Sequence, residues 1–173
     1  MSVDYSNQIH ENEVLQMRSL LVLFSYHHNN TEKIANVFAE VLGAQIKTPQ
    51  EIDAEELQEY SLIGFGSGIY DGKHHKLLLD LADKLPQVTN RKAFIFSTCT
   101  IEREVAKNHS TLREKLQSKG YMIVGEFGCA GFNTNSFARL FGGVNKGRPN
   151  AEDLKHAEEF AQNLKRAPRA AHS

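Results

Sequence analysis

The sequence contains no tryptophan, only two cysteines and only four prolines among its 173 residues. Two cysteines are too few for a disulfide framework, and neither Cys99 nor Cys129 belongs to a C-x-x-C pair. Both follow predicted strands that should be neighbours in a sheet, so we expect them to lie near each other. In a reducing compartment the expected state is two free thiols.

An excess of charge of one sign is also absent. The chain has 20 Lys and Arg residues against 21 Asp and Glu residues, which gives a formal net charge of −1. This balance offers no reason to expect nucleic acid or an acidic membrane as a partner. The apolar runs are far shorter than a membrane span, and residues 1–17 lack the pattern of a signal peptide. We therefore expect a cytoplasmic protein, monomeric or weakly dimeric.

The chain divides into one domain and two short ends. Residues 1–18 are polar and weakly patterned, which predicts a loosely held extension, and residues 166–173 should form a frayed tail. Residues 19–165 suffice for one domain with a full core. Five apolar runs of strand length occur within it, at 19–25, 44–47, 61–67, 92–98 and 121–127.

Helical patterns alternate with these strands. A short acidic helix is predicted at 53–59, and Asn150 should cap a last helix whose buried stripe ends at Leu164. Alternating strands and helices predict right-handed crossovers and an α/β fold with an open, doubly wound, parallel sheet. In such sheets, ligands bind beyond the carboxyl ends of the strands. Function should therefore lie in the loops after the first, third, fourth and fifth strands.

The loop after the first strand, 26–31, opens directly into a helix. A helix start presents free N–H groups and the positive end of the helix dipole, which favours an anion such as phosphate. Lys33 lies one turn into the helix, so the turn itself would hold a phosphate without a counter-charge. The alternative is that Asn30 or Thr31 only caps the helix.

The loop after the third strand, 64–76, is rich in glycine. It matches neither a Walker A loop nor the dinucleotide fingerprint, in which Ile69 would have to be glycine. Gly66 and Gly68 would let a flat ligand approach the backbone, and Tyr70 supplies an aromatic face. The alternative is a surface turn with an ordinary exposed tyrosine.

The loop after the fourth strand is shorter. Residues 97–100 are polar and offer hydroxyls and backbone amides to a ligand. Considered alone, this loop would be interpreted as a plain turn.

Together, these three loops resemble those of the flavodoxin family. NNTEKIA at 29–35 is similar to the family's junction between phosphate loop and helix, and 61–86 resembles its third strand, flavin loop and following helix. KAFIFST at 92–98 fits the fourth strand, and 147–164 fits the last helix. The resemblance covers residues 19–165. It implies a flavodoxin-like three-layer sandwich whose five-stranded parallel sheet has the order 2-1-3-4-5.

The resemblance also implies non-covalent FMN and electron transfer between redox partner proteins, a reductase and an acceptor. The first loop would wrap the FMN phosphate, and the second and third would line the flavin ring. The residues expected to bind FMN are Ser25, Tyr26, His27, His28, Asn29, Asn30 and Thr31 in the first loop, Ser67, Gly68, Ile69, Tyr70 and Gly72 in the second, and Ser97, Thr98, Cys99 and Thr100 in the third.

The chain departs from the usual family pattern in three ways. Tyr26, His28 and Asn29 stand where the family has Ser or Thr followed by Gly, so Ser25 and His27 are the expected substitutes. Many members place Trp in the second loop and Tyr in the third, whereas this chain has no Trp and carries 98–100 as Thr-Cys-Thr. Flavodoxins are also usually strongly acidic.

A metal site is the main alternative of another class. His27 and His28 follow the first strand, and His74 and His75 follow the third, so four imidazoles could converge. Adjacent residues point in different directions, however, and no spaced carboxylate or cysteine completes a ligand shell. We expect His74 and His75 to form a solvated helix start instead.

An FMN-dependent NAD(P)H oxidoreductase is the second alternative, because the loop 128–149 is long for a connection without structure of its own. It carries Arg139, Lys146 and Arg148, which could bind an anionic cofactor or dock a partner. A short helix at 135–141 is predicted within it. The sequence favours an electron carrier over a stand-alone enzyme.

Overall fold

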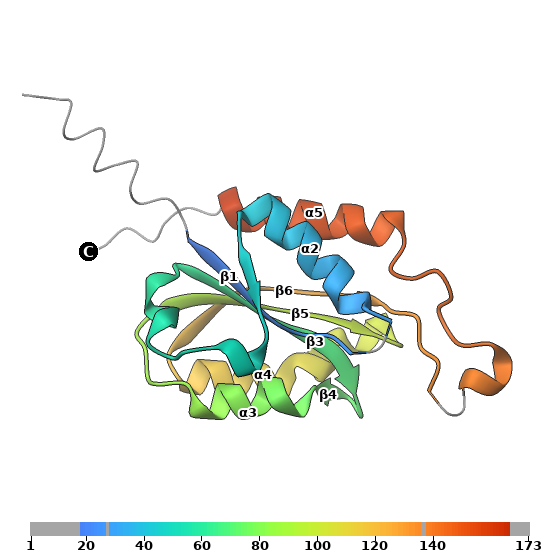
Figure 1. The fold of residues 1–173 in the computed structure, drawn as a ribbon, viewed down its shortest axis with the longest axis horizontal. Coiled ribbons are helices and arrows are strands. Elements are labelled where there is room, and N and C mark those ends of the chain that lie inside the picture. Colours follow the sequence, from blue (N-terminus) through green and yellow to red (C-terminus); the bar gives the residue numbers. More distant parts are fainter. Residues whose placement is uncertain (1–17, 27, 136–137, 167–173) are drawn as a thin grey trace, which may run out of the picture.

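The computed structural model describes residues 18–26, 28–135 and 138–166. Its centre is a sheet with a layer of helices on each face (Figure 1). The expected extension 1–18 lies outside the described residues except for Arg18, and the expected tail 166–173 lies outside them except for Arg166.

Five parallel strands form the main sheet, in the order β2-β1-β3-β5-β6. This is the order 2-1-3-4-5 that the resemblance implied, with one added strand, β4, paired antiparallel to the end of β3. The strands are β1 Ser19–Phe24, β2 Gln45–Lys47, β3 Leu62–Tyr70, β4 Lys73–His74, β5 Arg91–Cys99 and β6 Tyr121–Ala130.

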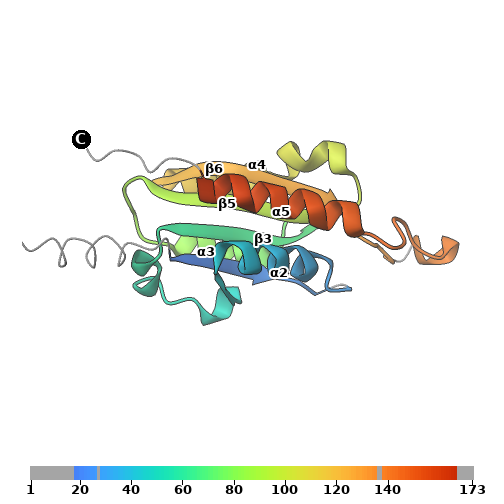
Figure 2. The ribbon, with the colours of Figure 1, turned by 90° about the horizontal axis from the view of Figure 1, so that it is seen from above.

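Among the described residues, four α-helices cover the two faces of the sheet. Helices α2 (Asn30–Leu42) and α5 (Ala151–Arg166) lie side by side on one face, and α3 (Lys76–Lys84) and α4 (Val105–Ser118) lie on the other (Figures 1 and 2). Each face has its own apolar core, because the central strands alternate their side chains between the two helix layers. Asn150 caps α5 as predicted, with its side chain accepting hydrogen bonds from the N–H groups of Glu152 and Asp153.

The core under α2 and α5 is aromatic. Phe38 is fully buried, and its ring contacts Phe94, Phe96 and Phe127 edge-on, with centroids 5.2–5.6 Å apart. Gly66 belongs to this core, because a Cβ there would lie 2.2 Å from the Phe96 ring. The interpretation of Gly66 as an approach site for a ligand is therefore wrong, since packing against Phe96 accounts for it.

Three local predictions differ from the structure. The acidic helix predicted at 53–59 is only a single-turn 3-10 helix, η2 (Glu56–Glu59), and another such turn, η1 (Pro49–Glu51), precedes the segment. Strand β3 continues to Tyr70 and turns back through Asp71 and Gly72, both with positive φ, so most of the expected second loop is a β-hairpin. Within the loop after β6, the described part of the expected helix is one 3-10 turn, η4 (Ala138–Phe141).

Within the described part of the chain, none of the helices combines the length and the apolar character needed to cross a bilayer.

Candidate functional site

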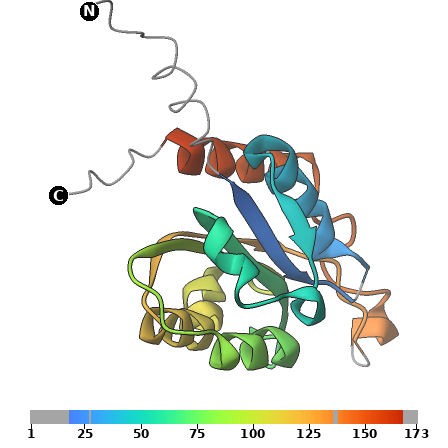
Figure 3. The ribbon, with the colours of Figure 1, turned by 60° about the vertical axis from the view of Figure 1, so that its left-hand side comes forward.

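The carboxyl ends of four strands meet at one edge of the sheet. Pairing places Phe24 beside Ser67, Ser67 beside Ser97, and Cys99 beside Ala130, so the segments that follow these strands are neighbours. The same edge carries the long loop after β6, which extends away from the sheet (Figures 1 and 3). The three predicted ligand segments therefore lie at one place in the fold.

The start of α2 is an unusual backbone segment. His28 and Asn29 both have positive φ, at 54° and 51°, directly before the first helical residue. Two successive non-glycine residues in this region are uncommon, and such strain is concentrated at functional sites. Asn29 occupies the capping position without a capping hydrogen bond from its side chain. The first-turn N–H groups of α2 are therefore available to an anion.

Asn30 and Thr31 do not cap the helix either. Both are buried, and Thr31 Oγ1 lies 2.8 Å from Thr98 Oγ1. The Asn30 side-chain amide donates to the Phe132 carbonyl at 2.8 Å, whereas its Oδ1 is buried and has no hydrogen-bond partner within the described part of the chain. An unpaired buried acceptor is costly, by about 1–3 kcal/mol, which is the cost that a ligand donor would remove.

The β3–β4 hairpin forms the second part of the site. The Ser67 hydroxyl lies 2.9 Å from His74 Nδ1 and 2.7 Å from the Gly68 carbonyl oxygen, on the side of the sheet that α3 and α4 cover. His75 caps α3 by accepting from the Leu77 N–H. The prediction of a solvated helix start is therefore right for the partly exposed His75 and wrong for His74, which is 2% exposed.

An aromatic group lies beside this hairpin. The His75 ring stacks on Phe24, with centroids 3.8 Å apart and an interplanar angle of 16°, and it meets the edge of Tyr70 at 5.2 Å. Ile69 and Tyr70 are half-buried, and Gly72 is exposed in the turn. The aromatic face that Tyr70 was expected to supply is thus part of a three-ring cluster.

Most of the third predicted ligand segment, residues 97–100, belongs to a strand and not to a loop. Ser97, Thr98 and Cys99 belong to β5 and are buried, whereas Thr100 is exposed. The Ser97 hydroxyl is 2.8 Å from His109 Nε2, and His109 Nδ1 is 3.0 Å from a Glu126 carboxylate oxygen. The Ser97 side chain therefore lies away from the ligand edge of the sheet, beneath α4.

Glu126 connects this buried network to a cation. Arg113 donates to both of its carboxylate oxygens, and this hydrogen bonding is the main reason why the pKa of Glu126 lies below its usual value. Burial lowers the pKa of His109 despite the neighbouring carboxylate. A neutral His109 that donates from Nδ1 to a charged Glu126 satisfies both groups.

The loop after β6 connects the first and third segments. His28 Nε2 lies 2.8 Å from Thr134 Oγ1, and the His28 ring packs on Phe132. On the other side, the Asn133 amide donates to Thr100 Oγ1, and the Asn145 amide donates to the Thr100 carbonyl. These contacts were not predicted from the sequence, although the asparagines at 133, 135 and 145 are a weak signal of polar loop contacts.

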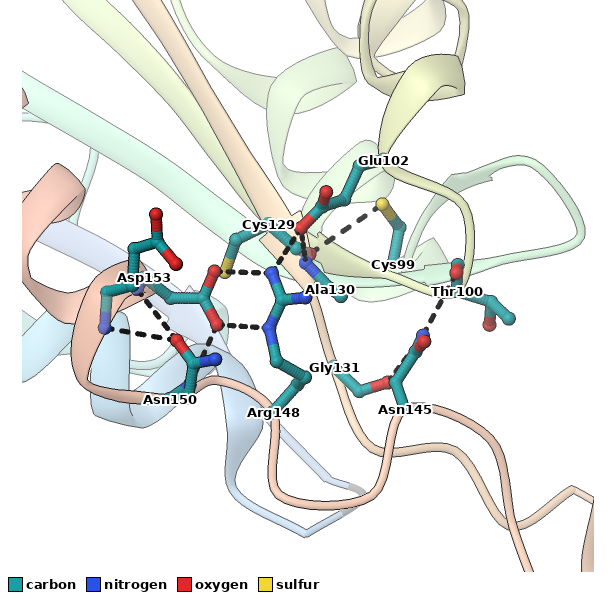
Figure 4. A network of polar contacts seen from close by, with 11 residues as sticks. Cys99, Thr100, Glu102, Cys129, Ala130, Gly131, Asn145, Arg148, Asn150 and Asp153 are labelled. Atoms are coloured by element: carbon teal, nitrogen blue, oxygen red, sulfur yellow. Dashed lines mark hydrogen bonds and ion pairs between the residues drawn. The ribbon is translucent and has the colours of Figure 1, made fainter.

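The base of this loop is fixed by Arg148 (Figure 4). Its guanidinium makes two hydrogen bonds to the buried Asp153 at 2.5 Å and one to Glu102. Burial alone would raise the pKa of Asp153, but hydrogen bonds from Arg148 and the Asn150 backbone outweigh it and keep that pKa low. Glu102 also accepts from the Ala130 N–H at the end of β6.

The two cysteines are free thiols, as expected, and their backbones are close. Cys99 Sγ lies 3.7 Å from the Cys129 carbonyl oxygen. Burial raises the pKa of Cys99 to about 11 and that of Cys129 further. Neither is a reactive thiolate at neutral pH.

The histidine metal site gains no support from the described residues. Among them, no group of three or more His, Cys, Asp or Glu side chains is placed to hold a metal. His28 is engaged with Thr134, and His74 and His75 point to different partners. His27 lies outside the described residues, so its expected phosphate contact stays a prediction.

The fold and the strand-end loops define a class: a doubly wound parallel α/β protein in which a helix start without a side-chain cap lies beside a hairpin. Comparisons with known proteins place the chain within that class. The sequence model described as "Flavodoxin domain" matches residues 21–131. The chain is also 47% identical over 148 residues to an uncharacterized protein of Methanocaldococcus jannaschii, covering 86% of this chain and 98% of that protein. The chain therefore belongs to the flavodoxin-domain family.

Solved structures agree in fold. The oxidised flavodoxin 2 of Bacillus cereus is similar with a TM-score of 0.64 at 21% identity, covering 86% of this chain and 97% of that one. A flavodoxin of Streptococcus pneumoniae TIGR4 is similar with a TM-score of 0.64 at 18% identity, covering 85% and 97%. Membership of the family implies a flavin cofactor.

Proposed function

We propose that this protein binds FMN non-covalently and transfers electrons between redox partner proteins. The observation that carries the proposal is the start of α2, where two left-handed residues lead into a helix without a side-chain cap. This backbone presents its N–H groups at the sheet edge where the family places a flavin. Bound FMN would accept and release one or two electrons.

The residues at this edge fit FMN. The first-turn amides of α2 would hold the phosphate, because they are directional donors at the positive end of a helix. The unpaired Oδ1 of Asn30 would accept from a ribityl hydroxyl, which supplies the missing donor. The exposed or half-buried members of the other two segments would border the ring; they are Gly68, Ile69, Tyr70, Gly72 and Thr100.

The first expected result is that the purified protein, reconstituted with FMN, has a flavin visible spectrum and binds FMN at a ratio of one to one. Asn30→Leu should weaken binding by at least about tenfold, because the acceptor is lost where the ligand needs it. Asn36→Leu, at an exposed position of the same helix, is the control. Absence of FMN binding by the unaltered protein would refute the proposal.

The reductase alternative loses one of its supports. Arg148 was a candidate for binding an anionic cofactor, but its guanidinium is committed to Asp153 and Glu102. Only Arg139 and Lys146 remain as exposed cations of the loop after β6. An electron carrier is therefore favoured, and steady-state NAD(P)H oxidation by the FMN-loaded protein alone should be negligible.

We also propose where a redox partner docks. Seven large apolar side chains are strongly exposed among the described residues, and five of them belong to the loops at the carboxyl edge of the sheet. Two of these, Leu140 and Phe141, are 77% and 76% exposed on the loop after β6. The five are Tyr26, Ile101, Leu140, Phe141 and Val144. Exposed apolar groups gathered beside a site favour a protein interface.

The charge on this loop indicates the kind of partner. Between Glu126 and Glu152 the sequence has no acidic residue, while Arg139 and Lys146 are exposed on the same loop as the apolar tip. A second copy of the chain would present the same positive charge and be repelled. An acidic redox protein, such as a plant-type [2Fe–2S] ferredoxin, is complementary.

The second expected result concerns this docking surface. Electron transfer from reduced ferredoxin to the FMN-loaded protein should slow at least about threefold as salt rises from low to physiological levels, because screening weakens the attraction. A double Leu140→Ser and Phe141→Ser variant should also react more slowly. Met122→Ser, at the opposite end of β6, should not change the rate. A rate that rises with salt would contradict an acidic partner.

A further inference from the structure

Two serines at the ends of neighbouring strands each pair with a buried histidine. Ser67 of β3 and Ser97 of β5 are register partners. Ser67 meets His74 at 2.9 Å, and Ser97 meets His109 at 2.8 Å. All four residues are at most 2% exposed, and the two imidazole rings are in contact, with centroids 4.9 Å apart. The pairs lie directly beneath the second and third predicted ligand segments.

The hydrogen bonds around Ser67 decide which nitrogen of His74 carries the proton. The Ser67 hydroxyl has one hydrogen and two lone pairs. The Gly68 carbonyl, 2.7 Å away, can only accept, and the His75 N–H, 3.0 Å away, can only donate. The hydroxyl hydrogen therefore goes to Gly68, and the remaining lone pair must accept from His74. All three contacts are satisfied only when His74 is protonated on Nδ1.

This assignment leaves His74 Nε2 as an unprotonated nitrogen. It is buried and has no hydrogen-bond partner among the described residues. The opposite tautomer would bury an unpaired N–H and set two acceptors, Ser67 Oγ and the Gly68 oxygen, 2.7 Å apart with no hydrogen between them. The Nδ1–H form is the better of the two.

The surroundings of His74 keep it neutral. Burial is the main cause that holds the pKa of His74 well below its usual value, and the neighbouring His109 adds to it. The groups next to it are Ser67 and Ile69 of β3, His75 at the start of α3, and the buried His109 of α4. None of these is a carboxylate that would favour the protonated ring.

We propose that His74, as the neutral Nδ1–H tautomer, is a positioning residue that fixes the Gly68 peptide through Ser67. The Gly68 peptide lies at the end of β3, where the family resemblance places the flavin. Rotation of its carbonyl would break the bond from Ser67, whose hydroxyl His74 and the His75 amide hold in place. We call this hydrogen-bonded set of His74, Ser67 and the Gly68 carbonyl the clamp. Its effect on FMN binding rests on the proposed function, whereas the clamp itself does not.

The clamp can be tested without flavin. In the FMN-free protein, nitrogen NMR of the His74 side chain should show protonated Nδ1 and unprotonated Nε2 across neutral pH. Removing the Ser67 hydroxyl with Ser67→Ala should speed hydrogen exchange of the His75 amide by at least about tenfold, because this amide donates to Ser67. An Nε2–H tautomer, or unchanged exchange in the variant, would overturn the proposal.

A pair of amide variants separates positioning from general support. The side-chain NH₂ of asparagine occupies the place of Nδ1, and that of glutamine occupies the place of Nε2. His74→Asn should therefore bind FMN within about threefold of the unaltered protein, whereas His74→Gln and Ser67→Ala should bind about tenfold more weakly. Equal losses for Asn and Gln would show that His74 acts only by filling space.

The two sets of results distinguish the two proposals. If the unaltered protein fails to bind FMN, the proposed function fails, and the tautomer and the exchange rates still decide the clamp. If His74→Gln does not fold, the comparison of Ser67→Ala with His74→Asn remains, because both keep the other partner of the pair.

Discussion

Phe38→Ala is expected to lower the free energy of unfolding by about 3–5 kcal/mol, the largest effect of any single change considered for this protein. Phe38 is fully buried in α2 and contacts the rings of Phe94, Phe96, Phe127 and Phe160. Truncation would remove the ring on which these four converge and leave a cavity that rigid strands cannot close. Urea unfolding followed by circular dichroism would measure the loss.

A graded pair of variants tests this explanation. Phe38→Leu keeps most of the apolar volume and should cost less than half as much, whereas Glu40→Ala, on the exposed side of α2, should change stability by less than about 0.5 kcal/mol. Equal losses for Leu and Ala would mean that the edge-on ring contacts, rather than the filled volume, are responsible.

Much of the fold could be predicted from the sequence because its strongest patterns are local. The central strands are nearly continuous in apolar residues, as strands covered on both faces must be. Asn150 and the stripe of α5 show capping and helical spacing together, and both are present in the structure. The acidic segment at 53–59 does not combine a capping residue with an apolar stripe at helical spacing, and it forms only a 3-10 turn.

The candidate site was predicted in position but not in detail. The strand-to-helix turn at 26–31 predicts an anion site from local chemistry alone. The direction of Ser67 and Ser97 depends instead on how far their strands continue. Once β3 reaches Tyr70 and β5 reaches Cys99, alternation turns both hydroxyls under α3 and α4. The sequence prediction ended these strands at 67 and 98, three residues and one residue early, and assigned both serines to the ligand.

The hydrogen bonds that the loop after β6 makes to the other segments could not be predicted from the sequence. They join residues more than 30 positions apart, such as Thr134 with His28 and Asn145 with Thr100. Short polar side chains form such bonds wherever the backbone brings them together, so composition says little about which pairs form. The sequence indicated only that the loop was long enough to have a role.

The hydrogen bonds of the loop after β6 link separate parts of the candidate site. The loop after β6 joins the turn before α2 to the end of β5, so the predicted phosphate and ring segments are held by one element. The same loop carries the exposed apolar tip, Leu140 and Phe141. A partner that docks on the tip, as we propose, would therefore contact a loop that is hydrogen-bonded to the proposed FMN-binding segments.

Arg148→Met should lower the free energy of unfolding by about 2–3 kcal/mol at neutral pH, because it leaves the carboxylate of Asp153 buried without its counter-charge. The estimate lies below the range for fully buried pairs, since the Arg148 side chain is 30% exposed, whereas that of Asp153 is 6% exposed. Glu102 is half exposed and should contribute little. FMN affinity should fall as well, because Arg148 anchors the base of the loop after β6.

The loss should depend on pH in a defined direction. The pKa of Asp153 is lower in the folded protein than in an unfolded chain, so its contribution is present above the unfolded value, about 3.9, and disappears as pH falls through the folded value. The stability difference between the unaltered protein and Arg148→Met should therefore be largest near neutral pH and shrink below about pH 4. A constant difference would assign the effect to packing of the arginine side chain.

A double variant identifies the buried charge as the cause. Asp153→Asn removes the charge but keeps an oxygen that can accept from the Asn150 N–H, as Asp153 does at 2.7 Å. Arg148→Met combined with Asp153→Asn should therefore be more stable at neutral pH than Arg148→Met alone, although it lacks one more native group. If the double variant were the less stable of the two, the uncompensated carboxylate would not be what destabilises the single variant.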